Sequence, residues 1–300
     1  MTVAEDLLEI AKKDFEACNV LYEQKIYNVF VFQLQQSIEK LVKSYGIEAG
    51  IIEEKDLRKK ISHLPHKVFA RYFGKKLEQE RILAKPTLLS DMIPPHQRQS
   101  EKTKQDYIDG LERVYKRASH VSLDEMSKIS SLEIKEVIEG FKSLEIFEYD
   151  EEARLKLIRD DFKKSYEHYK YYFKTVIKED ENAPSMQLFD LMLSNMEELT
   201  LRQLQEDKAL HDERHKITQI FYAWYNLSVI TSPHEQTSRY PSQTGPQPLK
   251  VYTAKHPIVE NFEEIKFIIT KTTQFYTELL STKGIVKAHQ EEFKVIDTVN

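Results

Sequence analysis

Apolar side chains recur at helical spacing along most of this 300-residue chain, and this periodicity constrains the fold more than any other feature. Only 7 glycines and 10 prolines interrupt the chain, which is too few for a fold built from many short strands. The pattern therefore predicts an all-α protein. Its first apolar face follows an i, i+3, i+7, i+10, i+14 course and consists of Leu8, Ala11, Phe15, Cys18 and Tyr22.

The same periodicity locates most of the expected helices. A helix over 3–23 precedes one over 27–46 that is apolar almost all round at its start, as central helices usually are. Pro65 favours the first turn of another helix, and Pro257 opens the last strong one, which ends at about Leu280. Further helical patterns cover 101–119, 123–128, 131–144, 150–179, 185–198 and 200–230.

The segment 231–257 is expected to be mostly irregular because it contains five prolines and Gly245. Val251–Thr253 is the only plausible short strand in the chain.

Composition narrows the class of protein. Charged residues make up 31% of the chain and the formal net charge is -5, so an RNA-binding site would have to be a local basic patch. Cys18 is the only cysteine, which excludes an intramolecular disulfide and a cysteine-based zinc site. The chain shows no signal-peptide pattern and no apolar stretch near the roughly 20 residues of a membrane span. We therefore expect a cytoplasmic protein with no membrane partner.

Two segments far apart in the chain carry the most specific pattern. Residues 35–43 read Gln-Gln-Ser-Ile-Glu-Lys-Leu-Val-Lys, and residues 232–241 read Ser-Pro-His-Glu-Gln-Thr-Ser-Arg-Tyr-Pro. Together they resemble the HEPN family (higher eukaryotes and prokaryotes nucleotide-binding), in which a four- or five-helix bundle is common. The family's glutamine followed by Glu-Lys corresponds to Gln36, Glu39 and Lys40 here.

The resemblance implies a HEPN-like helical bundle with an inserted helical lobe. Its first half would cover 1–74 and its second half 201–283, with the lobe at 75–200 and a tail at 284–300. The helices at 27–46 and 258–280 should then pack together, because each presents an apolar stripe that needs a partner.

Many HEPN proteins are metal-independent ribonucleases that carry an arginine, four to six other residues and then a histidine. Arg58 and His63, with four residues between them, form the only such pair in this chain. A histidine titrates near working pH and suits proton transfer, while an arginine stays charged and suits the developing phosphorane. The resemblance therefore implies that Arg58 and His63 are catalytic, with no metal and no cofactor.

A structural explanation of this pair stays open. Positions five apart on an unbroken α-helix point about 140° away from each other. The pair converges only if the chain bends before Pro65. Many active members also have a polar uncharged or acidic residue after the arginine, whereas Lys59 follows it here. In the alternative, Arg58 belongs to a solvated charged run and His63 caps the next helix.

The two HEPN-like segments also supply candidate substrate-binding residues, namely Lys40, His234, Arg239 and Tyr240. The alternative for Lys40 is an ordinary polar helix face, and the alternative for His234 and Arg239 is stabilisation of their loop. His211 and His215 have metal-ligand spacing, but we interpret them as a solvated face because no third ligand follows.

The resemblance implies an endoribonuclease of a defence or toxin–antitoxin type, acting on RNA as a homodimer and regulated by an antitoxin or sensor protein. The alternative is a non-catalytic HEPN-like module that binds a nucleotide or a partner protein. The position of the motif distinguishes them. The enzyme is favoured if Arg58 and His63 both face an open cleft, preferably at a two-fold interface, and burial of either in a helix-capping role favours binding.

Overall fold

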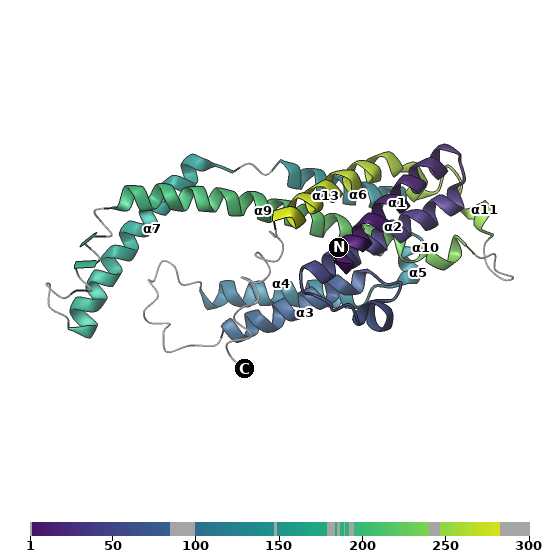
Figure 1. The fold of residues 1–300 in the computed structure, drawn as a ribbon. Helices are drawn as coiled ribbons and strands as arrows, with labels where there is room; N and C mark the ends of the chain where they lie inside the picture. The colour runs from purple at the N-terminus through teal and green to yellow at the C-terminus, as the bar shows by residue number, and fades with distance from the viewer. Residues whose placement is uncertain are drawn as a thin grey trace. The chain divides into compact units, whose positions relative to one another are not determined.

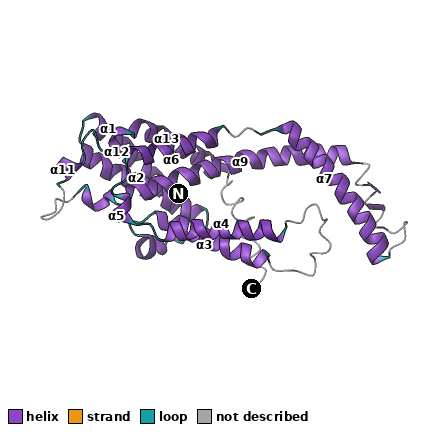
Figure 2. Cartoon of the chain, turned by 180° about the vertical axis from the view of Figure 1, so that it is seen from behind, coloured by secondary structure: helices purple, strands orange, loops and turns teal. Residues whose placement is uncertain are grey.

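A computed structural model describes residues 2–84, 100–146, 149–178, 184, 187–188, 190–191, 195–239 and 247–282. Among these residues the regular elements are all helical and none is a strand (Figure 2), so the predicted all-α class is confirmed. None of the described helices is both long and apolar enough to cross a membrane.

The elements follow one another along the chain as shown in Figure 1. The α-helices are α1 (Val3–Glu23), α2 (Tyr27–Glu48), α3 (His66–Leu83), α4 (Glu101–Ser119), α5 (Leu123–Met126), α6 (Ser131–Glu145), α7 (Glu151–Tyr172), α9 (Met196–Thr231), α10 (His234–Thr237), α11 (Pro248–Val251), α12 (Pro257–Glu260) and α13 (Phe262–Thr282). The described residues also include two π-helical turns, η1 (Leu57–Ile61) and η4 (Phe173–Ile177).

The chain forms two compact units. The first consists of Met1–Gln79, Gly110–Phe147 and His215–Asn300, and the second of Glu80–Asp109 and Glu148–Arg214. The first unit thus includes residues that the sequence assigned to the inserted lobe. The physical reason is that α6 directs its apolar face, with Ile134, Ile138 and Phe141, into the core of the first unit.

The first unit is built around α2. A capping box between Thr2 and Glu5 begins α1, which packs along α2. The apolar side chains of α2 are buried on several sides of the helix, so α2 lies at the centre of the core. The largest of them are Phe30, Leu34, Ile38, Leu41 and Tyr45.

The two ends of the described chain pack together, with α13 alongside α1 and α2 (Figure 1). The rings of Phe30 and Phe262 meet edge to face with their centroids 4.6 Å apart. Near the other end of α13, the Tyr45 and Tyr276 ring centroids lie 6.0 Å apart. The Nε1 of Trp224 in α9 donates to Thr272 Oγ1 at 2.9 Å. The predicted contact between 27–46 and the last helix is therefore confirmed.

Two glycines near the end of α2 have different roles. A Cβ on Gly46 would lie 2.8 Å from Val68 Cγ1, so this position needs glycine for close packing against α3. Gly50 has φ +65, a conformation that favours glycine and turns the chain out of the helix. The backbone N–H of Ile51 then donates to the Gly46 carbonyl at 2.9 Å, which closes the turn.

The expected strand at Val251–Thr253 is wrong. Pro248 stands at the first position of a helical turn, α11, which its fixed φ favours. The chain then directs Tyr252 inward, where its hydroxyl lies 2.8 Å from His234 Nδ1 and 2.7 Å from Thr237 Oγ1. Packing of one tyrosine thus outweighs the local strand propensity of three residues.

The last strong helix begins at Pro257 as predicted but is interrupted at Asn261, which separates α12 from α13. The Nδ2 of Asn261 donates to the Pro257 carbonyl at 2.8 Å and to Ser131 Oγ at 2.7 Å. These two bonds stabilise the break and join it to the start of α6.

Candidate active site

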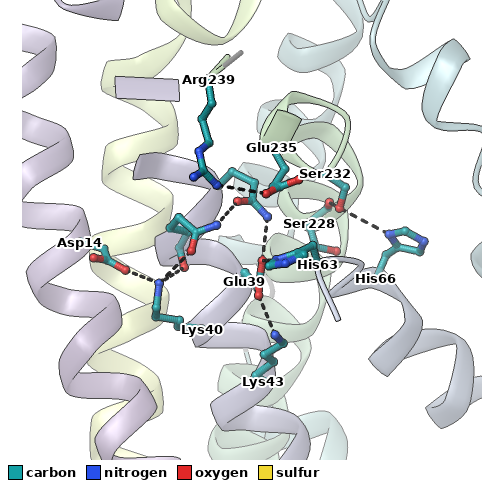
Figure 3. A network of polar contacts seen from close by, with 12 residues as sticks. Asp14, Glu39, Lys40, Lys43, His63, His66, Ser228, Ser232, Glu235 and Arg239 are labelled. Atoms are coloured by element: carbon teal, nitrogen blue, oxygen red, sulfur yellow. Dashed lines mark hydrogen bonds and ion pairs between the residues drawn. The ribbon is translucent and has the colours of Figure 1, made fainter. Parts of the chain in front are cut away.

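The central helix α2 buries a carboxylate, Glu39, which is only 5% exposed. Its Oε1 accepts a hydrogen bond from Lys43 Nζ at 2.6 Å, and its Oε2 accepts one from Gln35 Nε2 at 3.0 Å. The Nδ1 of His63 lies 3.2 Å from the same Oε2 (Figure 3). Burial of a charge is costly unless it is paired and hydrogen-bonded, and these contacts meet both conditions for Glu39.

His63 reaches Glu39 because the chain turns sharply just before α3. The backbone N–H of Ser62 donates to the Leu57 carbonyl at 2.9 Å, five residues back, as in a π-helix. Ser62 itself has φ 48 and ψ -124, an uncommon conformation for a residue other than glycine. Such strained positions cluster at functional sites, where surrounding contacts maintain them. The side chain of His63 is nevertheless 58% exposed.

Arg58 lies in η1, the wide turn that ends just before His63. Its side chain is exposed and makes no hydrogen bond or ion pair with any residue that the structure describes. The geometric objection to this pair assumed an α-helix, in which five residues give about 140°. In a π-helix the hydrogen bonds join residues five apart, so this spacing is close to one full turn. Arg58 lies within this wide turn, and His63 is the second residue after the turn ends at Ile61.

A buried aspartate, Asp56, fastens this turn to α3. Its Oδ2 lies 2.5 Å from Arg71 Nη1, and its Oδ1 lies 2.8 Å from Lys60 Nζ. Hydrogen bonding by Lys60, and then by Arg71, lowers the pKa of Asp56 well below its usual range. The carboxylate thus stays charged at neutral pH and compensates the positive charge of Lys60. Arg58 has no acidic partner among the described residues.

Lys40, a predicted substrate contact, belongs to the same network. Its Nζ donates to Asp14 Oδ2 at 2.6 Å and to Gln36 Oε1 at 3.2 Å. The Nε2 of Gln36 donates in turn to Gln35 Oε1 at 2.7 Å. The Lys40 side chain is only 22% exposed. Lys40 is therefore engaged by an acid of α1 and joined through two glutamines to Glu39.

The loop after α9 holds the other predicted substrate contacts. His234 is 3% exposed, its Nδ1 lies 2.8 Å from the Tyr252 hydroxyl, and burial lowers its pKa to about 3. Tyr240 lies outside the described residues. The burial of His234 supports the alternative for this residue, stabilisation of its own loop.

Arg239 is exposed at the same loop. Its guanidinium lies over the Phe32 ring at 4.6 Å from the centroid and 3.5 Å from Glu235 Oε1. Figure 3 shows Arg239 and Glu235 on the opposite side of Glu39 from Lys43. These contacts hold the loop against α2 while keeping a cation at the surface.

Sequence reasoning missed the role of Glu39. The i, i+4 spacing of Glu39 and Lys43 is typical of a surface ion pair, and this pattern contains no sign of a contact 24 residues away. One signal was present: Glu39 lies on a helix that was expected to be central, where a charged side chain needs several partners.

Residues 4–139 match the family model of the HEPN domain. The chain contains a HEPN domain. No curated protein and no solved structure shows a significant match to it. The HEPN match begins in α1, ends in α6 and includes Glu39, Arg58 and His63. It also takes in residues 75–139, which the sequence had placed outside the HEPN-like bundle, whereas the loop segment 232–241 lies beyond it.

Proposed function

We propose that this HEPN domain is a metal-independent endoribonuclease in which His63 transfers protons and Arg58 stabilises negative charge. The observation that supports this most strongly is the placement of His63. Its Nδ1 is held by a buried carboxylate, which leaves Nε2 of a largely exposed ring available to a substrate. This arrangement of a histidine and a carboxylate recurs where imidazole acts as a general base.

The reaction needs no nucleophile from the protein. His63 removes the proton from a ribose 2′-hydroxyl, and the resulting oxygen attacks the adjacent phosphorus. The bond from phosphorus to the 5′-oxygen breaks, and that oxygen receives a proton, carried by His63 or by solvent. The products are a 2′,3′-cyclic phosphate and a 5′-hydroxyl. No net oxidation or reduction occurs.

Arg58 supplies the fixed charge. Its guanidinium is exposed and has no acidic partner in the described part of the chain, so it is available to phosphate oxygens. An arginine offers a planar set of donors that fits two oxygens of a phosphate. Negative charge grows on these oxygens in the phosphorane-like transition state, which Arg58 would therefore stabilise more than the substrate.

We further propose that the active form is a symmetric homodimer in the cytoplasm, of a defence or toxin–antitoxin type, with an antitoxin or sensor protein as regulator. One arginine and one histidine per chain make a small site, and two-fold pairing would bring two such pairs together. Arg239 remains our proposed contact to a substrate phosphate, because its cation is exposed beside α2.

The experiment is an RNA-cleavage assay in excess EDTA with the wild-type protein, His63→Ala and Arg58→Ala. Loss of a general acid–base group typically costs about 10²–10⁴ in rate, so both variants should be nearly inactive with unchanged circular dichroism. His120→Ala is the matched control, since it removes another exposed histidine of the first unit. Wild-type activity in His63→Ala would refute the assignment.

A non-catalytic HEPN-like module that binds a nucleotide or a partner protein is the second candidate. The observation that favours it is the Glu39–His63 contact, because it would equally fasten the turn before α3. In that case His63→Ala would lower the unfolding temperature, and the wild type would bind nucleotides without any turnover of RNA.

A further inference from the structure

We propose that Glu39 is a positioning residue that fixes the tautomer of His63, and that a chain of hydrogen-bond donors starting at Lys40 orients it. The proposal rests on the proposed ribonuclease function, because it names what prepares the histidine for proton transfer. It also gives Lys40 a different task from the substrate contact that the sequence predicted.

The direction of the chain follows from its first member. The ammonium group of Lys40 donates hydrogen bonds and accepts none, so the Gln36 atom that lies 3.2 Å from it must be the amide oxygen. The Gln36 amide nitrogen then faces Gln35 and donates to its Oε1 at 2.7 Å. Gln35 in turn directs its amide nitrogen toward Glu39 Oε2 at 3.0 Å.

Each amide in this chain has one orientation only. Rotation of either glutamine would place an NH2 group against the Lys40 ammonium or against the neighbouring amide nitrogen. Asp14 anchors the first cation, since its Oδ2 lies 2.6 Å from Lys40 Nζ and its Oδ1 accepts from Gln33 Nε2 at 2.7 Å. The orientation is thus set by an ion pair between α1 and α2.

The far end of the chain holds Glu39 from two sides. Lys43 donates to Oε1 at 2.6 Å, and the Lys43 side chain is itself only 12% exposed, so a cation compensates the buried carboxylate. An ionised carboxylate accepts hydrogen bonds and donates none. The ring nitrogen 3.2 Å from Oε2, Nδ1 of His63, must therefore carry the proton.

The consequence lies at the other nitrogen of the ring. With its proton on Nδ1, neutral His63 presents the lone pair of Nε2, which is the form that a general base requires. Without such a partner a neutral imidazole exchanges between two tautomers. Glu39 would thus raise the fraction of competent rings without touching RNA, and Gln35 would keep the carboxylate oxygen aligned with the ring.

The test is nitrogen-15 NMR of the histidine rings in the full chain without RNA, at a pH where the ring is neutral, with His63 assigned from the spectrum of His63→Gln. The wild type should show Nδ1 protonated and Nε2 unprotonated. Glu39→Gln should remove this bias. The new side-chain amide must place its NH2 group against Lys43 or against Gln35, so it cannot accept hydrogen bonds on both sides as the carboxylate does.

A second variant keeps the test valid if Glu39→Gln fails to fold. In Glu39→Leu combined with Lys43→Leu, both members of the buried pair are removed, which costs less than leaving one buried charge unpaired. Glu235→Gln is the control, since it removes another largely buried carboxylate of the first unit, one that pairs with Arg239 rather than with His63. This control should keep the wild-type tautomer.

Kinetics separate positioning from structure. Both Glu39 variants should lower kcat about 10- to 100-fold, the range seen for residues that orient metal-binding histidines, while KM for an RNA oligonucleotide stays within about 2-fold. An Nε2-protonated wild-type ring, or a tautomer unaffected by Glu39→Gln and the double variant, would overturn the proposal. If the tautomers are as expected but the wild type does not cleave RNA, only the proposed ribonuclease function is overturned.

Discussion

The hydroxyl of Ser44 in α2 lies 2.8 Å from the hydroxyl of Tyr276 in α13, although 232 residues separate them in the chain. Ser44 Oγ also lies 2.6 Å from the Ala4 carbonyl, to which it donates its only proton. Tyr276 must therefore donate to Ser44. This chain of two bonds joins α1, α2 and α13 within the core that supports the candidate active site.

The direction of these bonds predicts unequal effects of two substitutions. Ser44→Ala leaves the Tyr276 hydroxyl and the Ala4 carbonyl without their partner, which should cost about 1–3 kcal/mol of unfolding free energy. Tyr276→Phe removes a donor and leaves the bond from Ser44 to Ala4 in place, so it should cost about 1 kcal/mol. Urea denaturation measures both. A larger loss in Tyr276→Phe would contradict the assigned direction.

A buried histidine predicts how stability depends on pH. Burial lowers the pKa of His256 to about 4 in the folded protein, whereas the unfolded value is near 6.5. The unfolded chain therefore binds the proton more readily, and this contribution is fully present above about pH 6.5 and lost as pH falls toward 4.

His256→Asn should remove this contribution while keeping the helix start, because asparagine is a good N-cap and the Nδ1 of His256 accepts from the Ile258 N–H at 3.3 Å. Between pH 7 and pH 4.5 the wild type should lose on the order of 2 kcal/mol more than the variant. Urea denaturation at both pH values measures these losses. If the wild type and His256→Asn lose the same unfolding free energy between pH 7 and pH 4.5, the pKa of His256 is not lowered in the fold.

Much of the fold followed from periodicity. The helices at 3–23 and 101–119 have the predicted bounds, and the capping pattern of Ser130 and Glu133 begins α6 as expected. These features are local, so neighbouring residues determine them. The turn at Leu57–Ile61 and the φ of Ser62 were not predicted, because tertiary contacts such as Asp56 with Arg71 maintain a conformation that local propensity disfavours.

The candidate site was predictable in its residue types but not in its connections. Arg58 and His63 were identified from their spacing, and both side chains are exposed, while their role in catalysis stays a prediction. Glu39 entered only as part of a helix pattern, since a contact between α2 and the turn before α3 depends on how the chain folds back. For the same reason the burial of His234 was not visible in its proline-rich segment.

Lys40 and Arg239 should differ in their effect on RNA binding. If Lys40 only orients Gln36, its loss should leave the affinity for RNA unchanged. Lys40→Met should therefore lower kcat without changing the salt dependence of RNA binding. Arg239→Ala should remove one phosphate contact and reduce the slope of log K against log salt by about 0.7 for single-stranded RNA. Fluorescence anisotropy with a non-cleavable 2′-deoxy oligonucleotide measures both slopes. A shallower slope in Lys40→Met would restore it as a substrate contact.

The proposed homodimer predicts a mass near twice the 35.5 kDa of one chain. Light scattering at micromolar concentration should report that mass for the wild type and for His63→Ala, because the variant removes a catalytic group rather than a packing one. A strictly monomeric wild type that still cleaves RNA would show that one chain forms a complete site.

The most direct test of the ribonuclease is a pair of oligonucleotides that differ only at the mapped cut site, one with a ribose and one with a 2′-deoxyribose, each incubated in excess EDTA. We predict cleavage of the ribose substrate to a 2′,3′-cyclic phosphate and a 5′-hydroxyl, with the 2′-deoxy substrate left intact, since the 2′-hydroxyl is the nucleophile. Cleavage of the 2′-deoxy substrate, or cleavage that stops in EDTA and returns with a divalent ion, would contradict the account.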